Sequence, residues 1–128
     1  GVRVPEEWVF DSDWSAGDAH RTAMGLLSRP DRPTAIIAGS DEIALGVLGA
    51  ARSLALDVPS DLSIVGIDDH DLAEVFGLTT VRQDVAAQGV AAAQTLLVHL
   101  GLLDAGTVPD QSFPVELVVR NSTARIDR

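Results

Sequence analysis

The chain has 128 residues, 46% of them apolar, which suffices for one domain with a hydrophobic core. Its formal net charge of −10 disfavours nucleic-acid binding by these residues, because a phosphate backbone repels an acidic surface. The absence of cysteine and lysine excludes disulfides, zinc–thiolate sites, Schiff-base chemistry and lysine-containing phosphate loops.

The first half of the chain alternates short apolar runs with helical patterns. Residues 8–10 are a brief strand candidate, and Ser15 and Asp18 then have the spacing of a capping box that starts a helix. The continuous apolar run at 34–38 predicts a strand buried in a parallel sheet. Residues 40–42 follow it with the composition of a turn and a second helix start.

The second half continues the same alternation. Its predicted strands span residues 62–67, 78–81 and 114–120, and its predicted helices span 72–76 and 84–100. Strands and helices that alternate with short links predict an α/β fold, with a parallel sheet flanked by helices.

The long helix predicted at 84–100 is mostly apolar. Such a broad apolar surface must pack against something substantial. We expect the chain alone to cover it by dimerising, with exchange of this helix between copies. The helix carries one polar stripe, formed by Asp84, Gln88, Thr95 and His99.

Polar side chains gather after each predicted strand. In open parallel sheets, ligands bind beyond the carboxyl ends of the strands, so these side chains should converge on one rim. Carboxylates accept hydrogen bonds from sugar hydroxyls, and an indole packs against the apolar face of a sugar ring. The pattern therefore predicts a polyhydroxyl ligand. The residues concerned are Asp11, Ser12, Asp13 and Trp14, then Ser40 and Asp41, then residues 68–71, then Gln83 and Asp84.

Structural roles compete with ligand binding at these positions. Ser40 at a helix start is more readily an N-cap, and Trp14 is equally well a core or interface residue. Asp69 and Asp71 are more readily solvated or capping residues. Asp68 is the strongest candidate, because an acid directly after a buried strand pays a desolvation cost unless something binds it.

Enzymatic interpretations find little support. Residues 68–71 contain three carboxylates and an imidazole, but consecutive residues rarely converge on one metal ion, and neither an HExxH nor an EF-hand spacing is present. Gly39-Ser40-Asp41 lacks the second glycine of a nucleophile elbow, and a phospho-acceptor site would need a lysine. We therefore expect a binding protein, not an enzyme, with no metal or cofactor.

Six motifs occur in a recognisable order over almost the whole chain. They lie at residues 13–16, 32–36, 40–46, 58–69, 78–84 and 119–123. Together they resemble the effector-binding domain of lac/galactose-type repressors. The resemblance implies a periplasmic-binding-protein-like fold of two α/β subdomains with a ligand cleft between them.

The resemblance also divides the chain. It implies that residues 1–83 and 113–123 belong to the carboxy-terminal subdomain, and that 84–112 belong to the other subdomain. The chain begins with Gly-Val-Arg and not Met, and we expect the DNA-binding helix-turn-helix to lie in an upstream portion. The whole protein would then be a cytoplasmic homodimeric repressor that binds a small effector, expected to be a sugar, and operator DNA.

The same resemblance assigns roles to individual residues. Asp68 matches the family acid that binds effector hydroxyls, and Trp14 matches an aromatic residue of the pocket. Ser40 takes the place of a frequent Asn beside Asp41, and Gln83 lies on a crossing strand that reaches the pocket.

Gly46 and Gly49 lie on the helix that forms part of the family's dimer interface, where glycine would allow close approach of two helices.

Alternatives remain open for the whole protein. An extracytoplasmic sugar-binding protein of a transporter has the same fold and ligand class. No run approaches the roughly 20 apolar residues of a membrane span, and no signal peptide opens the chain. The sequence leaves effector identity open, including a purine-like molecule, and it leaves induction and co-repression equally open.

Overall fold

The computed structural model describes residues 3–104 and 110–125. One sheet contains four strands in the order β1-β2-β3-β4, with β1, β2 and β3 parallel and β4 antiparallel to β3. This architecture confirms the predicted α/β fold class. In chain order the elements are a 3-10 helix at Glu6–Trp8, α1 Ala16–Leu27, β1 Ala35–Ile37, α2 Asp41–Ser53, β2 Ser63–Asp68, α3 Asp71–Val75, β3 Thr79–Gln83, α4 Val85–His99 and β4 Val115–Val118.

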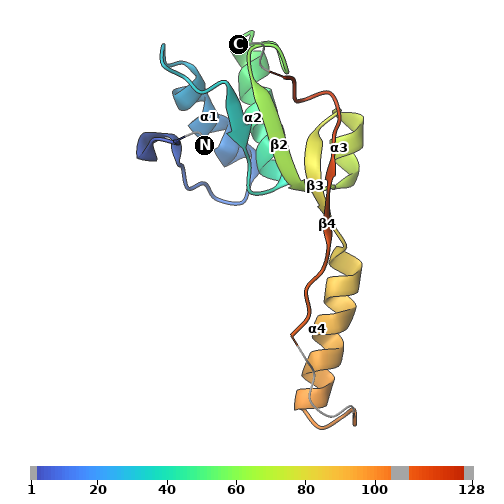
Figure 1. Cartoon of the computed structure of the whole chain (residues 1–128). Coiled ribbons are helices and arrows are strands. Elements are labelled where there is room, and N and C mark those ends of the chain that lie inside the picture. Colours follow the sequence, from blue (N-terminus) through green and yellow to red (C-terminus); the bar gives the residue numbers. More distant parts are fainter. Residues whose placement is uncertain (1–2, 105–109, 126–128) are drawn as a thin grey trace.

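The hydrophobic core lies between one face of the sheet and the helices α1, α2 and α3 (Figure 1). Paired residues of neighbouring strands share a face, and the register places Ile36 beside Ile64 on the covered side. Ile64 and Leu78 are fully buried, and Ala44 and Ala50 of α2 pack into the same cluster.

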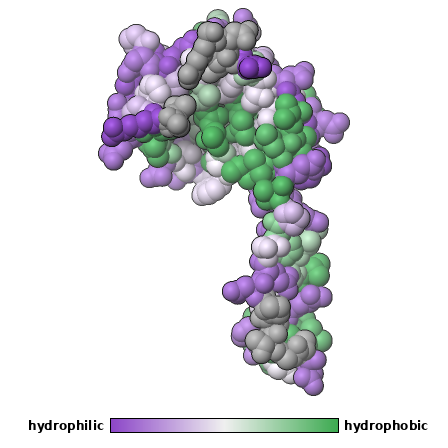
Figure 2. All heavy atoms as spheres, in the orientation of Figure 1, coloured by the Kyte–Doolittle hydropathy of each residue, from purple (hydrophilic) through white to green (hydrophobic). Residues whose placement is uncertain are grey.

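The opposite face of the sheet is open. Ile37 is 80% exposed, and Val65 beside it in the register is only half-buried. Figure 2 shows apolar side chains gathered over the strands in this view. The strand predicted at 34–38 is therefore present, but the prediction that it is buried is wrong, because helices cover only one side of it.

The prediction of a strand at 8–10 is also wrong. Pro5 precedes a short 3-10 helix, in which the Trp8 amide donates to the Pro5 carbonyl and the Val9 amide to the Glu6 carbonyl, both at 3.0 Å. A proline φ near −65° suits a helix start. Val9 and Phe10 are exposed and pair with no strand of the described sheet.

Side-chain caps fix the helix starts that the sequence predicts. The Ser15 hydroxyl accepts from the Asp18 amide, and the Ser40 hydroxyl accepts from the Ile43 amide, both at 3.2 Å. The Asp18 carboxylate completes only half of a capping box, because it accepts from the Asp13 amide.

Helix α4 extends away from the sheet, and none of its residues is buried (Figure 1). Its Asp84 carboxylate caps the first turn by accepting from the Ala87 amide at 2.8 Å. Leu96 is 58% exposed, which agrees with the broad apolar surface read from the sequence. Exchange of this helix between copies stays a prediction. No helix of the described residues has the length and apolar character needed to cross a membrane.

Gly46 allows close packing of α2 on α1 within one chain. A Cβ at position 46 would lie 2.3 Å from the Ala16 carbonyl oxygen and 2.8 Å from the Ala19 Cβ. A Cβ at Gly49 would lie 3.3 Å from the His20 ring. Contact with α1 thus accounts for glycine at 46, and the dimer-interface role of both glycines stays a prediction.

We expect Gly46→Ala to lower the free energy of unfolding by about 2 kcal/mol, because overpacking would push α1 off α2. Gly25→Ala in α1 is the matched control, since nothing lies within 4 Å of its added methyl group. The control should gain about 1 kcal/mol from helix propensity. Urea denaturation of both variants measures the difference, and equal effects would contradict the packing argument.

Candidate functional site

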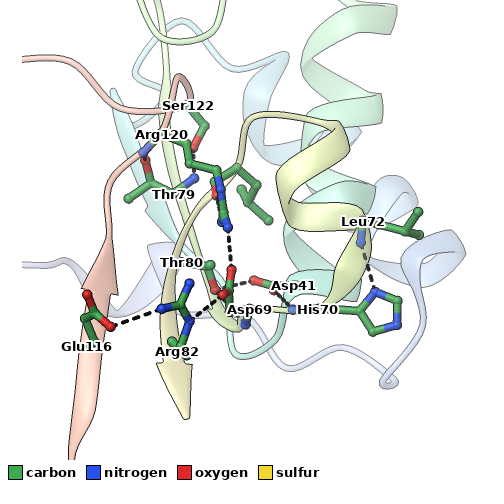
Figure 3. Close-up of polar contacts among 11 residues, drawn as sticks. Asp41, Asp69, His70, Leu72, Thr79, Thr80, Arg82, Glu116, Arg120 and Ser122 are labelled. Atoms are coloured by element: carbon green, nitrogen blue, oxygen red, sulfur yellow. Dashed lines mark hydrogen bonds and ion pairs between the residues drawn. The ribbon is translucent and has the colours of Figure 1, made fainter. Parts of the chain in front are cut away.

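The carboxylate of Asp41 is buried and connects the segment after β1 to β3 and to the backbone after β2. Asp41, the first residue of α2, is 1% exposed. Its Oδ1 accepts from the Thr80 hydroxyl of β3 at 2.6 Å, and its Oδ2 accepts from the His70 amide after β2 at 2.8 Å (Figure 3). These bonds offset the cost of burying a carboxylate. The bond to His70 brings together the residues that follow β1 and β2, and a separate hydrogen bond from Gln83 to Asp68 joins the ends of β3 and β2.

Gly66 makes room for this carboxylate. A Cβ at position 66 would lie 2.1 Å from the Asp41 Oδ1 and 3.1 Å from Leu78. The middle strand therefore needs glycine here, although glycine in a strand interior usually weakens the strand.

The backbone turns sharply at the end of β2. Asp68 and Asp69 have φ angles of 119° and 57°, in the left-handed region that non-glycine residues rarely adopt. Such strain is found preferentially at functional sites. The two carboxylates have different partners: Asp68 Oδ1 accepts from the Gln83 Nε2 at 2.6 Å, whereas Asp69 contacts two arginines.

Asp69 ties three segments of the chain together. Its carboxylate accepts from Arg82 Nε of β3 at 2.6 Å and from Arg120 Nη2, which follows β4, at 2.7 Å (Figure 3). Arg120 also donates to the Leu78 carbonyl at 2.8 Å, and Arg82 reaches Glu116 of β4 at 3.1 Å. The prediction that Asp69 is solvated or capping is wrong, because its side chain is only 11% exposed and holds both arginines.

Two opposing effects act on the pKa of Asp69. Burial alone raises the pKa, but hydrogen bonds and charges from Arg120 and Arg82 outweigh it and lower the pKa below its ordinary value. The same contact raises the pKa of Arg82. Asp69 is therefore charged at neutral pH, and it attracts Arg82 of β3 and Arg120 after β4 electrostatically.

Trp14 and Ser40 lie together at the end of β1. The Trp14 side chain is exposed, and its ring lies 3.7 Å from where a Cβ would stand on Gly39. Ser40 is buried and its oxygen accepts from the Ile43 amide, so its N-cap role is established. The register sets Ile37 beside Val65, so Gly39 comes level with the last residues of β2. The ligand roles of Trp14, Ser40, Asp68 and Gln83 stay predictions.

The other two residues of the run 68–71 lie at the start of α3. His70 Nδ1 accepts from the Leu72 amide at 3.3 Å, and Asp71 is the exposed first residue of the helix. Within residues 3–104 and 110–125, no three side chains of the types His, Cys, Asp and Glu are arranged to hold a metal ion.

A separate apolar groove lies between the outer surfaces of α2 and α3. Phe76, at the end of α3, is 46% exposed and Leu72 is 43% exposed. The lining residues are Leu45, Leu48, Gly49 and Arg52 of α2 with Leu72 and Phe76.

Comparison with known proteins identifies the family to which this chain belongs. Residues 1–123 match the periplasmic binding protein-like domain. The chain belongs to this domain family. The regulator MalR of Streptomyces coelicolor is 44% identical over 126 residues, which cover 94% of this chain and 35% of that protein. This periplasmic binding protein-like chain thus spans about a third of that relative's length.

Solved structures of regulators share its fold. A LacI family transcriptional regulator from Lactobacillus casei with bound sucrose has a TM-score of 0.80 at 30% identity, covering 95% of this chain and 46% of that one. The lac repressor dimer bound to operator and the anti-inducer ONPF has a TM-score of 0.76 at 32% identity, covering 89% and 40%. The predicted resemblance to lac/galactose-type repressors is confirmed.

We expect Asp69→Asn to lower the free energy of unfolding by about 2 kcal/mol at pH 7, because Arg120 loses the anion that it contacts. A lowered folded-state pKa means that the ion pairs stabilise fully above the unfolded pKa and are lost as pH falls through the folded value. The deficit of the variant should therefore be constant above about pH 5 and shrink in stronger acid.

Asp31→Asn is the control for this experiment, because Asp31 pairs with Arg29 by two similar hydrogen bonds on the exposed surface. Urea denaturation from pH 3 to 7 gives the comparison. A deficit in Asp69→Asn that is no larger than in the control would refute the role of Asp69.

Proposed function

We propose that this chain is the effector-binding portion of a sequence-specific transcriptional repressor. Its ligand would be a small polyhydroxyl molecule, expected to be a sugar, bound by Trp14, Ser40, Asp68 and Gln83. The observation that carries the proposal is the Asp68–Gln83 pair, held at 2.6 Å on a left-handed turn at the carboxyl end of a parallel strand. That is the edge at which open α/β sheets bind ligands.

The relatives support a regulator. MalR is named a transcriptional regulator, and the Lactobacillus casei regulator was solved with bound sucrose. These names favour a repressor over the transport receptor, and a binding role over an enzymatic one. The whole protein would be cytoplasmic, and it would contact operator DNA through a segment other than this acidic chain.

The proposed mechanism uses the two crossing strands. Residues 1–83 and 113–123 would form one subdomain, and 84–112 would belong to the other. β3 leads out to α4 and β4 leads back, so these two strands would form the crossing. Asp69 contacts Arg82 of β3 and Arg120, which follows β4. Effector that bridges both subdomains would change their relative angle. Coupling of this kind is typically about 1–3 kcal/mol and is reciprocal between the effector and operator sites.

We also propose that the repressor is a homodimer and that a second copy covers the groove between α2 and α3. The exposed Leu72 and Phe76 support this surface, and Gly49 lies in the same lining. Burial of such apolar area is the dominant favourable term in association.

Asp68→Ala in the full-length regulator should abolish the effector response and leave operator binding intact, because it removes the acceptor for ligand hydroxyls. The matched control is Asp71→Ala, which removes an exposed acid three residues away. Operator binding measured by fluorescence anisotropy with and without sugars tests both variants. Induction of Asp68→Ala at the native level would sink the assignment.

Phe76→Glu should weaken dimerisation of the full-length regulator at least tenfold, or about 1.4 kcal/mol, because it places a charge in the apolar groove. Ser60→Glu adds the same charge on the exposed turn before β2 and should leave the dimer unchanged. Sedimentation velocity over a concentration series measures the dimer dissociation constant. Identical constants for the two variants would exclude this interface.

A further inference from the structure

We propose that Gln88 is a positioning residue of the effector site, which holds the Gln83 carboxamide in place against Asp68. The proposal rests on the proposed function of Asp68. Gln88 Nε2 donates to Gln83 Oε1 at 3.2 Å, and Gln83 Nε2 donates to Asp68 Oδ1 at 2.6 Å. Both glutamines are half-buried. The three side chains form one directed chain of hydrogen bonds from α4 to the end of β2.

Asp68 sets the orientation of the Gln83 carboxamide, and Gln88 binds the oxygen at its other end. A carboxamide has a donor end and an acceptor end, whereas an ionised carboxylate only accepts. If the Gln83 amide turned over, its oxygen would face the Asp68 carboxylate, and its NH2 group would face the NH2 group of Gln88. The contact with Asp68 would then be repulsive, whereas the Gln88 carboxamide can present either of its ends. Asp68 therefore sets the orientation, and Gln88 holds the carboxamide in place by donating to its oxygen.

This orientation determines what a ligand would meet. Among the described residues, Asp68 Oδ2 accepts no hydrogen bond, and Gln83 Nε2 donates to Asp68 alone. A free carboxylate oxygen therefore stands close to a free amide N–H. A hydroxyl donates and accepts, so two adjacent hydroxyls satisfy both groups together. The site would then prefer a vicinal diol, and the Asp68 charge would disfavour a phosphate or carboxylate at this point.

The resonance of the Gln83 side-chain amide gives a test that needs no ligand. Nitrogen-15 glutamine labelling of the full-length regulator should show a Gln83 amide proton that exchanges slowly, because the proton is held by a carboxylate. Gln88→Ala should shift that signal and speed its exchange several-fold. The matched control is Gln94→Ala, on the same helix and exposed, which should leave the signal unchanged. An unchanged Gln83 signal in Gln88→Ala overturns the proposal.

Sucrose binding, measured by calorimetry, tests the effect on the site. Gln88→Ala should weaken sucrose affinity about fivefold to tenfold, as expected for one hydrogen bond of about 1 kcal/mol. Gln88→Glu should weaken it further, because a carboxylate at 88 would attract the Gln83 NH2 group and turn the amide over. Native affinity in both variants, with binding lost in Asp68→Ala, overturns this inference and leaves the proposed function standing.

The same experiments can also support the positioning role of Gln88 while contradicting the effector role of Asp68. If Gln88→Ala shifts the Gln83 signal while Asp68→Ala binds sucrose normally, the positioning role stands and the effector role of Asp68 fails. If the native protein does not bind sucrose, the Gln83 resonance alone decides the positioning role.

Discussion

The buried carboxylate of Asp41 is the constraint on which the rest of this molecule depends. It joins the start of α2 to Thr80 of β3 and to the backbone after β2, and so fixes the segment after β1 against both neighbouring strands. Its presence demands glycine at position 66, where any side chain would overlap the Oδ1. Because both carboxylate oxygens accept hydrogen bonds, the charge is buried without an unsatisfied group, and the rim has one defined geometry.

That geometry gives two adjacent acids separate roles. The left-handed turn costs on the order of 1–3 kcal/mol for each non-glycine residue. Asp68 faces Gln83 at the candidate site, whereas Asp69 holds Arg82 of β3 and Arg120, which follows β4. The candidate ligand residue and the residue that holds both arginines are therefore neighbours in the chain, so one backbone turn fixes the positions of both carboxylates.

Local patterns in the sequence predicted most elements of the fold. They did not predict contacts between residues that lie far apart in the chain. Caps at Ser15 and Ser40 involve residues three positions away, so spacing alone revealed them. Asp69 was misjudged because its partner Arg120 lies 51 residues later in the chain. The strand expected at 8–10 failed because a short apolar run needs a neighbouring strand to pair with, which no local pattern supplies. The convergence of polar residues was predictable from the general behaviour of parallel sheets.

Helix α4 extends away from the sheet, so a small rotation where it leaves β3 moves its far end over a larger distance. A helix of 15 residues is about 22 Å long, and it behaves as a rigid rod joined to the sheet at one end. Rotation of about 15° at its base, a size known for rigid-body transitions, would carry its far end through about 6 Å. A small rotation of the helix near Asp84 would thus become a displacement of several ångströms at His99.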